Sequence, residues 1–465
     1  TEIYTLSLHD ALPILLVTTG RVVVVEIFLS KAKPRITQEG PTLPVTMEQN
    51  FGTLTITTVP VNCLVDCPTA GIEGYKKFRS LMRVEQVPEG KHQLVLTRGE
   101  ITLKVEIDIP RYGRCVVEAD FLKSTITSKV IQEGNPELAE AYKFRSPEQR
   151  VGPLAEFGGS DRSEQAVELG LKWLADHQEP DGHWNTAKWG GHGPYDPGVA
   201  GLALLAFLGA GNTQTEGKYS DNVRRAAKWL WERQDPKGSF APGQTMYNHA
   251  IPLLALLELS GMGGSPRVRA VAKKGLDYML EVRNPNRAWR YWPKDGDNDM
   301  SVTFWCVKAM RAAKTAGFEV PEEAWLGVRE FADQLTDHAT GVTGYTSRPV
   351  RGAAEQPFQT YSMTACGVLA RIYMGTSLED EIVRKGVGVL MENLPDWHQP
   401  GINSPFFYYW EAGTLAMFEF GGVDWGMWNL RAQELLLTHQ ISTDGELKGS
   451  WDPEAQHHFR SEERR

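Results

Sequence analysis

The chain has 465 residues, of which 23% are charged and 41% are hydrophobic, and its formal net charge is −9 at pH 7. This length allows two or three domains. The acidic balance, with no run of basic residues, argues against nucleic acid as the main partner. No stretch reaches the roughly 18 uncharged apolar residues of a membrane helix. The composition is therefore that of an ordinary globular chain.

The two ends of the chain do not read as protein. Residues 1–14, TEIYTLSLHDALPI, match the in-frame translation of a common sequencing adapter, and residues 460–465, RSEERR, match the same adapter reversed. Such scars are excluded from fold reasoning. We therefore expect residues 15–459 to be the genuine part, a fragment whose native termini and any signal or anchor lie outside it.

The first part of the genuine chain has the composition of β-structure. All fourteen tryptophans lie at or after Trp173, and the residues before it are rich in Val, Thr and Ile, as strands are. Residues 15–49 are predicted to be strand-rich, with Val22 to Val25 inside a strand. Residues 53–57 and 101–107 alternate between apolar and polar residues, and residues 87–92 form a turn between them.

This turn, together with Gly52-Thr53-Leu54, resembles the PEGA domain, a small β-sandwich, over residues 50–122. The resemblance implies an extracytoplasmic or membrane-associated location, with envelope proteins among the partners. Residues 123–160 are predicted to form a linker with a short helix at 135–142. Five cysteines are predicted to be buried structural residues, with one disulfide in the β part left open: Cys63, Cys67, Cys115, Cys306 and Cys366.

From Leu169 to Trp451 the chain repeats one phrase six times. A small residue is followed three residues later by an aromatic or aliphatic pair, then often by glutamine, then by glycine and an aromatic residue. A repeat of about fifty residues indicates a repeat architecture. The two clearest copies are Gly170, Trp173-Leu174, Gln178, Gly182 and Trp184, and Ala226, Trp229-Leu230, Gln234, Gly238 and Phe240.

Each phrase is predicted to end an amphipathic helix, and a second, wholly apolar helix follows, as at residues 199–207 and 251–257. A helix that is apolar on every side is buried, so the alternation predicts two concentric rings of helices. We expect the glycine to form a left-handed turn and the glutamine to satisfy free carbonyls at the end of its own helix.

These phrases resemble the QW repeat of the terpene-cyclase and protein-prenyltransferase superfamily, also called the prenyltransferase and squalene oxidase repeat. The region from 161 to 459 is similar to a bacterial, planctomycete-like group with that repeat. The resemblance implies an (α/α)6 toroid. With the β-sandwich in front of it, the chain is expected to be mainly α with a small β domain. Eleven of its twelve helices can be counted, and the last apolar helix would follow Trp451.

In such a toroid the ligand site is the hollow of the inner ring. Polar and aromatic residues near the starts of the apolar helices are therefore the candidate ligand-binding residues. They are Asp196, Tyr247, Asn248, His249, Thr303, Tyr361, Ser362, Tyr408, Tyr409, Trp410 and Glu411.

Three kinds of chemistry are weighed at this rim. Class II terpene cyclases use an acidic aspartate of an Asp-x-Asp-Asp motif, and the nearest match here is Asp299 with Asp297, helped by His249 or Tyr247. Asp299 is equally a natural N-cap of the helix that follows. A zinc site of the prenyltransferase kind would need Asp299, Cys306 and His249, but their spacing differs, so no metal or other cofactor is expected.

The third kind of chemistry is polysaccharide cleavage, for which the aromatics at 408–410 would stack on sugars. The main expectation is a binding or scaffold protein whose toroid holds an apolar small molecule or lipid, such as an isoprenoid. An isoprenoid cyclase or transferase-like enzyme and a polysaccharide-active protein are the alternatives.

Overall fold

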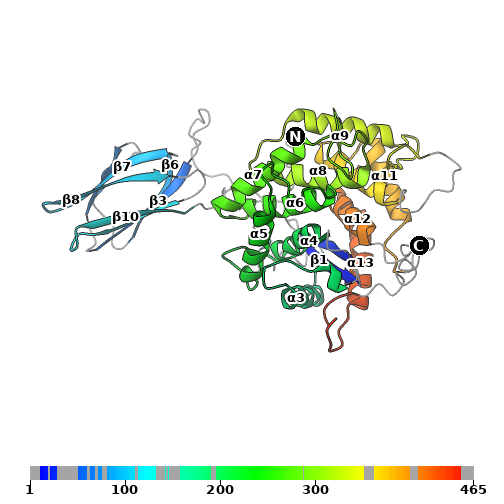
Figure 1. Ribbon diagram of the computed structural model, residues 1–465, viewed down its shortest axis with the longest axis horizontal. Coiled ribbons are helices and arrows are strands. Elements are labelled where there is room, and N and C mark those ends of the chain that lie inside the picture. Colours follow the sequence, from blue (N-terminus) through cyan, green and yellow to red (C-terminus); the bar gives the residue numbers. More distant parts are fainter. Residues whose placement is uncertain are drawn as a thin grey trace. The chain divides into compact units, whose positions relative to one another are not determined.

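A computed structural model of the chain shows two compact units (Figure 1). The β unit spans Pro34–Glu140, and the helical unit comprises Thr1–Lys33 and Ala141–Arg465. The protein is mainly helical, with a small and largely antiparallel sheet region towards its N-terminal side. The structure describes residues 11–18, 21–28, 51–59, 63–68, 72–75, 81–88, 90–109, 114–131, 142, 145, 158–189, 195–285, 287–349, 361–397 and 407–451.

The β unit contains two four-stranded sheets, in the orders β10-β9-β3-β6 and β5-β4-β7-β8. Strands β3 and β9 run parallel, and the other pairs are antiparallel. Ile56 and Val117 of the first sheet share one buried core with Leu94 and Ile107 of the second. The strands are β3 Phe51–Val59, β4 Leu64–Cys67, β5 Ile72–Tyr75, β6 Leu81–Pro88, β7 Gly90–Arg98, β8 Ile101–Ile109, β9 Arg114–Asp120 and β10 Thr125–Ile131.

Three expectations for the β region can be compared with these strands. The alternating segments 53–57 and 101–107 lie in β3 and β8, and the turn at 87–92 joins β6 to β7 across Gly90, whose φ is +114°. Strand β10 extends the β unit beyond residue 122 into the segment expected to be a linker, because it pairs with β9 along its length. The short helix expected at 135–142 lies outside the described residues, except for Tyr142.

The helical unit alternates two kinds of helix, as the repeat predicts. The described helices number eleven. The amphipathic helices are α3 Asp161–Asp176, α5 Ser220–Arg233, α7 Pro266–Glu281, α9 Glu322–Leu335, α11 Glu381–Glu392 and α13 Gly422–His439. The buried helices are α4 Asp196–Gly209, α6 Tyr247–Gly261, α8 Met300–Thr315, α10 Met363–Tyr373 and α12 Phe407–Phe420, and nearly every residue in them is excluded from solvent.

The buried helices contact one another in succession, α4 to α6 to α8 to α10 to α12. The last amphipathic helix, α13, contacts the first, α3. An antiparallel hairpin of β1 (Ala11–Thr18) and β2 (Arg21–Phe28) contacts both α12 and α4, the two ends of the buried succession (Figure 1). The strand expected at Val22 to Val25 is therefore confirmed, and it belongs to the helical unit. The place expected for a twelfth helix, after Trp451, lies outside the described residues.

The repeated phrase joins each helix pair to the next. Gln178 donates from Nε2 to the carbonyl of Asn222 in α5 at 3.0 Å, and to the carbonyl of Gly182 in its own loop at 2.9 Å. Gln234 makes the same two bonds, to α7 and to its own loop. Gln440 repeats them with the carbonyls of Ala166 in α3 and of its own loop, so the last phrase is bonded to the first helix. We call this set of contacts the repeat lock.

The glycine of the phrase has two roles in the repeat lock. Its φ is positive, as expected, at +111° in Gly182, +107° in Gly238 and +95° in Gly449. A Cβ on Gly182 would also lie 2.3 Å from the carbonyl oxygen of Arg225 in the next amphipathic helix. Gly449 stands equally close to the carbonyl of Leu169. Only glycine therefore permits both the turn and the close approach of the two backbones.

The expectation for the glutamine was wrong. Its side-chain amide donates to a backbone carbonyl of the next amphipathic helix, and not to one at the end of its own helix. The tryptophan of the phrase caps its own helix instead. Trp184 donates from its indole nitrogen to the carbonyl of Leu174 at 2.9 Å. The indoles of Trp289 and Trp451 make the equivalent bonds to their own helices at 2.8 and 2.7 Å. An indole N–H thus satisfies one of the carbonyls that a helix end leaves free.

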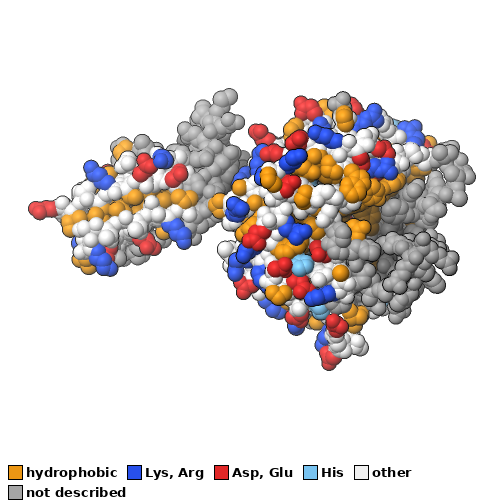
Figure 2. Space-filling model, viewed as in Figure 1, with side chains coloured by type: hydrophobic (Ala, Val, Ile, Leu, Met, Phe, Trp, Pro, Cys, Tyr) orange, Lys and Arg blue, Asp and Glu red, His pale blue; other side chains and the backbone are white. Residues whose placement is uncertain are grey.

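Acidic and basic side chains are interspersed over the visible face of the helical unit, with apolar side chains between them (Figure 2). Among the described residues, no helix is long and apolar enough to cross a membrane. All five cysteines are buried and free, so the burial predicted for them is confirmed and the disulfide left open for the β part is not formed in this structure.

Candidate functional site

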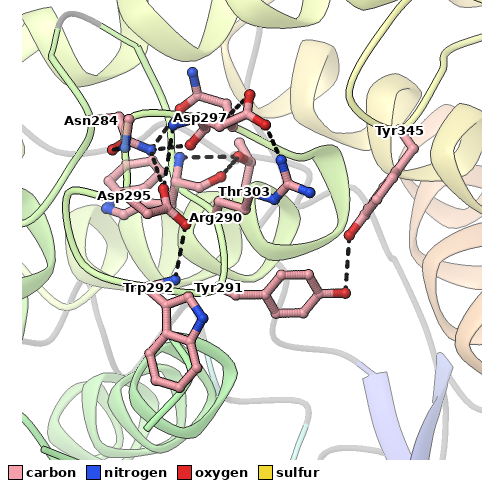
Figure 3. A network of polar contacts seen from close by, with 11 residues as sticks. Asn284, Arg290, Tyr291, Trp292, Asp295, Asp297, Thr303 and Tyr345 are labelled. Carbon is pink, nitrogen blue, oxygen red and sulfur yellow. Dashed lines mark hydrogen bonds and ion pairs between the residues drawn. The ribbon is translucent and has the colours of Figure 1, made fainter. Parts of the chain in front are cut away.

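The acidic loop before α8 is folded around Asn284 (Figure 3). The side-chain nitrogen Nδ2 of Asn284 donates to Asp295 Oδ1 at 3.2 Å and to Asn298 Oδ1 at 3.3 Å. Its carbonyl oxygen accepts from the Gly296 amide at 3.0 Å, and Asp295 Oδ2 accepts from the Trp292 amide at 3.2 Å. These bonds show that Asp295 and Asn298 shape the loop itself.

The two acids predicted to be catalytic lie in different environments. Asp297 is 59% exposed and forms an ion pair with Arg290 (Figure 3). Asp299 is fully buried. The charge of Asp297 is therefore neutralised near the surface, whereas Asp299 is held inside the helical unit.

Asp299 is the N-cap of α8, with φ −136° and ψ 151°. Its Oδ1 accepts hydrogen bonds from the amide of Val302 at 2.8 Å and from the hydroxyl of Ser301 at 2.7 Å. Its Oδ2 is buried and has no hydrogen-bond partner in the described part of the chain. Burial raises the pKa of Asp299, and the Val302 and Ser301 bonds oppose that rise. The N-cap interpretation is confirmed, and it leaves half of the carboxyl unused.

Ser301 connects this carboxyl to two aromatic side chains. The hydroxyl of Tyr247, at the start of α6, donates to Ser301 Oγ at 2.6 Å. The hydroxyl of Tyr408, at the start of α12, donates to the Ser301 carbonyl at 3.1 Å. Burial raises the pKa of both phenols well above the usual range, so both stay protonated and able to donate. Side chains from three buried helices therefore meet at Ser301.

Two further tyrosines reach the same place from loops. The hydroxyl of Tyr345 donates to that of Tyr291 at 3.0 Å (Figure 3), and the rings of Tyr291 and Tyr247 lie 5.9 Å apart. Burial, followed by the Tyr291 bond and the nearby Asp299, raises the pKa of Tyr345. We call the six residues Asp299, Ser301, Tyr247, Tyr291, Tyr345 and Tyr408 the tyrosine cluster.

Sequence reasoning missed Tyr291 and Tyr345, although a signal was present. Tyr291 stands two residues after Trp289, which ends the third copy of the phrase. The sequence assigns Tyr345 itself to the end of the fourth copy, but in the structure Thr343 takes the place equivalent to Trp289, since its amide donates to Thr364 as that of Trp289 donates to Thr303. The backbone carbonyl of Tyr291 accepts from the amide of Met246, just before α6, at 2.8 Å. That of Tyr345 accepts from the amide of Met300, the first residue of α8, at 3.0 Å. Residues at this offset are thus placed over the starts of buried helices.

A second set of predicted residues also bonds backbone groups of the phrases, and we include these contacts in the repeat lock. His249 Nδ1 accepts from the Phe240 amide at 3.4 Å, and its Nε2 donates to the Gly275 carbonyl at 3.1 Å. Burial lowers the pKa of His249 to about 4. Thr303 both accepts from the amide and donates to the carbonyl of Trp289. These side chains satisfy backbone groups of the phrase, and neither belongs to the tyrosine cluster.

Asp196 and Asn248 also have partners within the protein. Asp196 Oδ1 accepts from the amide and hydroxyl of Thr186 at 3.0 and 2.6 Å, and its Oδ2 lies 3.8 Å from His183 Nε2. Asn248 accepts from the Gly198 amide at 3.2 Å, which ties α6 to α4. Both contribute to the packing of neighbouring segments.

In the aromatic run at 408–410, Tyr408 is partly exposed and the next two residues are enclosed. Tyr409 and Trp410 are fully buried, and the Tyr409 hydroxyl donates to the Asn393 carbonyl at 2.6 Å. The ring of Trp410 packs between Trp397 and Phe407, at 5.8 and 5.4 Å. This arrangement gives no exposed platform for stacking on sugars at these residues.

The two predicted residues at the start of α10 have different environments. Tyr361 is partly exposed, and its ring lies 5.9 Å from that of Tyr409. Ser362 is fully buried, and its Oγ has no hydrogen-bond partner in the described part of the chain. Ser362 is therefore a second unused polar group, on the helix next to α8.

Glu411 pairs with a lysine that the sequence reasoning overlooked. Lys308 of α8 and Glu411 of α12 form an ion pair in which both side chains are almost fully buried. Burial raises the pKa of Glu411, and the Lys308 charge opposes that rise. The Lys308 ammonium also lies 4.3 Å from the centre of the Trp305 ring. A lone lysine in the middle of an apolar helix was the available signal.

A surface cavity lies elsewhere in the helical unit. It has a volume of about 620 Å³ and is lined by α3 and by the connection from α4 to α5, including Leu171, Asn212 and Tyr219. None of the tyrosine cluster lines it. The Tyr219 hydroxyl donates to Glu168 at 2.8 Å at its edge.

Comparisons with known proteins add little to this geometry. No family model and no curated protein matches the chain. Among solved structures, a protein from Actinoplanes is 18% identical, with a TM-score of 0.39, over 63% of this chain and 83% of that chain. A similarity of this size assigns neither fold nor function, so function has to be argued from the site.

Proposed function

We propose that the protein is a binding or scaffold protein whose helical unit takes an apolar ligand, an isoprenoid or another lipid, at the tyrosine cluster. In this proposal the helical unit is an α/α toroid of the QW-repeat type and the β unit is a PEGA-like β-sandwich. Such a β-sandwich favours an extracytoplasmic or membrane-associated location, with envelope proteins as further partners.

The repeat lock supports the toroid. The bonds that join α3 to α5 and α5 to α7 recur between the last phrase and α3, through Gln440 and Ala166. Repeats that contact only their neighbours in sequence form open solenoids. A last repeat bonded to the first is instead what a closed arrangement requires.

The observation that carries the function is the composition of the tyrosine cluster. Tyrosine rings from α6, α12 and two loops gather at the start of α8. Aromatic walls with a few placed polar groups are typical of sites that bind apolar molecules in a fixed orientation. Asp299 is held there as a cap, and Asp297 is paired with Arg290.

Isothermal titration with geraniol tests this proposal. We expect saturable binding that Tyr247→Ala and Tyr408→Ala each weaken about tenfold, a loss of about 1.4 kcal/mol. The control is Tyr219→Phe, which alters only the rim of the separate cavity. The proposal fails if neither geraniol nor a polar-lipid extract binds or stabilises the protein.

An isoprenoid-converting enzyme is the second candidate, and the state of Asp299 favours it. A buried carboxyl with a raised pKa and one oxygen without a partner can supply a proton to an alkene. The assay is product formation from squalene or farnesyl diphosphate. The enzyme proposal requires turnover that Asp299→Asn abolishes, whereas the exposed Asp297 is dispensable for it; without turnover, the binding proposal stands alone.

A further inference from the structure

Two buried polar atoms at the starts of neighbouring helices have no hydrogen-bond partner among the described residues: Oδ2 of Asp299, before α8, and Oγ of Ser362, before α10. Both residues are fully excluded from solvent, and α8 and α10 contact each other. Leaving such atoms unbonded costs free energy, so native proteins rarely do so without a reason. A guest that bonds both atoms would remove that cost.

Tyr408 shows that these two helix starts lie close to one group. Its hydroxyl is 3.1 Å from the carbonyl of Ser301, which follows Asp299 on α8 by two residues. The same hydroxyl is 3.6 Å from Sγ of Cys366, one turn beyond Ser362 on α10. Burial raises the pKa of Cys366, and the charge of Asp299 adds to that rise. The Tyr408 hydroxyl therefore contacts the first turn of α8 and lies beside α10 one turn beyond Ser362.

The hydrogen-bond directions in the cluster determine what a guest must offer. The hydroxyl proton of Ser301 is donated to Asp299, and that of Tyr247 is donated to Ser301. Neither proton is available to a guest. At the two buried atoms without a partner among the described residues, Asp299 Oδ2 offers lone pairs that only accept from a donor when the carboxyl is ionised, and the hydroxyl of Ser362 can both donate and accept.

From these directions we propose that the tyrosine cluster recognises a hydrogen-bond donor head, a hydroxyl or a protonated amine, on the apolar ligand. The head donates to Asp299 Oδ2 and contacts Ser362 Oγ, while the apolar body lies against the rings of Tyr247 and Tyr408. This inference rests on the proposed function, and it adds the chemical class of the ligand.

The same arrangement discriminates against an anionic head. A carboxylate would place a second negative charge beside the buried Asp299, and like charges at short range disfavour each other strongly where water is excluded. A hydroxyl brings no such charge and can also accept from Ser362. A protonated amine is favoured by the Asp299 charge and by the surrounding aromatic faces.

Titration of the full chain at pH 7 with geraniol, geranylamine and geranate tests the inference, because these three probes share one body and differ in the head. We expect geraniol and geranylamine to bind at least tenfold more tightly than geranate. Asp299→Asn should weaken geranylamine at least tenfold and reduce its advantage over geranate. Ser362→Ala should weaken geraniol by a smaller factor.

Asparagine is a good N-cap, so Asp299→Asn should keep the fold. Asp380→Asn is the matched control, because Asp380 caps the amphipathic helix α11 through the Ile382 amide at 2.8 Å, and it should leave all three affinities unchanged. If Asp299→Asn does not fold, Ser362→Ala and the wild-type order of the three probes still decide the question.

The possible failures are distinguishable. If geranate binds as tightly as geraniol, the donor-head inference is overturned and the proposed function stands. If the affinities of all three probes are unchanged in both Asp299→Asn and Ser362→Ala, the two atoms hold only internal water and the inference is again overturned. If no probe binds, the inference is overturned, and the proposed function falls with it when a polar-lipid extract also fails to bind or stabilise the protein.

Discussion

The starts of the buried helices carry polar side chains of two kinds. His249 and Thr303 belong to the repeat lock, and each exchanges hydrogen bonds with backbone groups of a phrase. Asp299 lies four residues before Thr303 at the start of α8, Ser362 lies at the start of α10, and each has a buried atom that no described residue bonds. Polar residues at the starts of the buried helices thus differ: in the repeat lock their side chains have hydrogen-bond partners, whereas Asp299 and Ser362 each keep an atom without one among the described residues.

This difference separates architecture from function. A buried polar group whose partners are all backbone atoms of the same protein holds segments together. A buried polar group without a partner weakens the fold unless something else binds it. The repeat lock is therefore where substitutions should lower stability, and the tyrosine cluster is where they should alter binding. The predictions below test that division, beginning with the largest expected change.

The ion pair of Lys308 with Glu411 tests whether burial alone makes a group functional. It is buried, charged and fully partnered, so by our division it is architectural. Lys308→Met should lower the free energy of unfolding by about 3–5 kcal/mol, because Glu411 would remain buried without its counter-charge. Chemical denaturation followed by circular dichroism of the helices measures this loss.

The matched control is the double variant Lys308→Met/Glu411→Leu, which removes both charges. It should recover most of the stability, because a buried ion pair can often be replaced by apolar residues of similar volume. Equal losses in the single and double variants would show instead that the shape of the side chains, and not the charge, is what matters there.

His249 gives the architectural side a pH dependence. Its pKa is about 4 in the folded protein, compared with 6.5 for an unperturbed histidine. The folded state therefore binds fewer protons, and the stability that His249 contributes is present above pH 6.5 and lost as the pH falls towards 4. The loss over that window is about 3 kcal/mol. His249→Gln should flatten this part of the stability curve.

Asp299 should act in the opposite direction. Burial raises its pKa, so its contribution is largest below pH 3.8 and is lost as the pH rises through the folded value. A stability curve that is measured for wild type, His249→Gln and Asp299→Asn separates the two groups. Parallel curves for all three proteins would contradict the assignment of these residues to different roles.

Much of this division could be anticipated from the sequence. The glycine turns, the alternation of amphipathic and apolar helices and the Asp299 cap follow from local rules of backbone geometry and periodicity. The partner of Gln178 could not be anticipated, because it is a carbonyl in the next repeat, 44 residues away. Because Gln178 is bonded to the next repeat, the indole of Trp184, and not the glutamine, donates to the free carbonyl at the end of the helix.

The buried ion pair and the tyrosine cluster were harder to foresee than the repeat lock. Lys308 and Glu411 are 103 residues apart, and only the packing of α8 with its neighbours brings them together. Tyr291 and Tyr345 lie in irregular loops, where only their offset from the end of a phrase marks them. Tyr247 and Tyr408 were recognised because each begins a helix, and the rule that polar groups at helix starts converge succeeded for them and failed for His249.

Gly182 provides a test of the repeat lock that leaves every polar group in place. Gly182→Ala should destabilise the helical unit by about 2–3 kcal/mol, because the turn has a positive φ and the new Cβ would meet the carbonyl of Arg225. The control is Gly243→Ala, with a φ of +75° and nothing within 4 Å of the added Cβ. It should cost only about 1 kcal/mol. Equal losses would mean that the close approach between repeats does not contribute.

The smallest expected effect is the most direct test of the comparison. Thr303→Val leaves the Trp289 amide without its hydrogen-bond partner, whereas the Trp289 carbonyl still accepts from the Asp299 amide at 3.0 Å, so the substitution should cost about 2 kcal/mol. Asp299→Asn keeps an N-cap oxygen for the Val302 amide and removes a carboxyl oxygen that had no partner, so it should cost less than about 1 kcal/mol. Denaturation at pH 7 of the two variants side by side decides the order. If Asp299→Asn is the more destabilising, the carboxyl is part of the architecture, and the tyrosine cluster loses the group on which its proposed role depends.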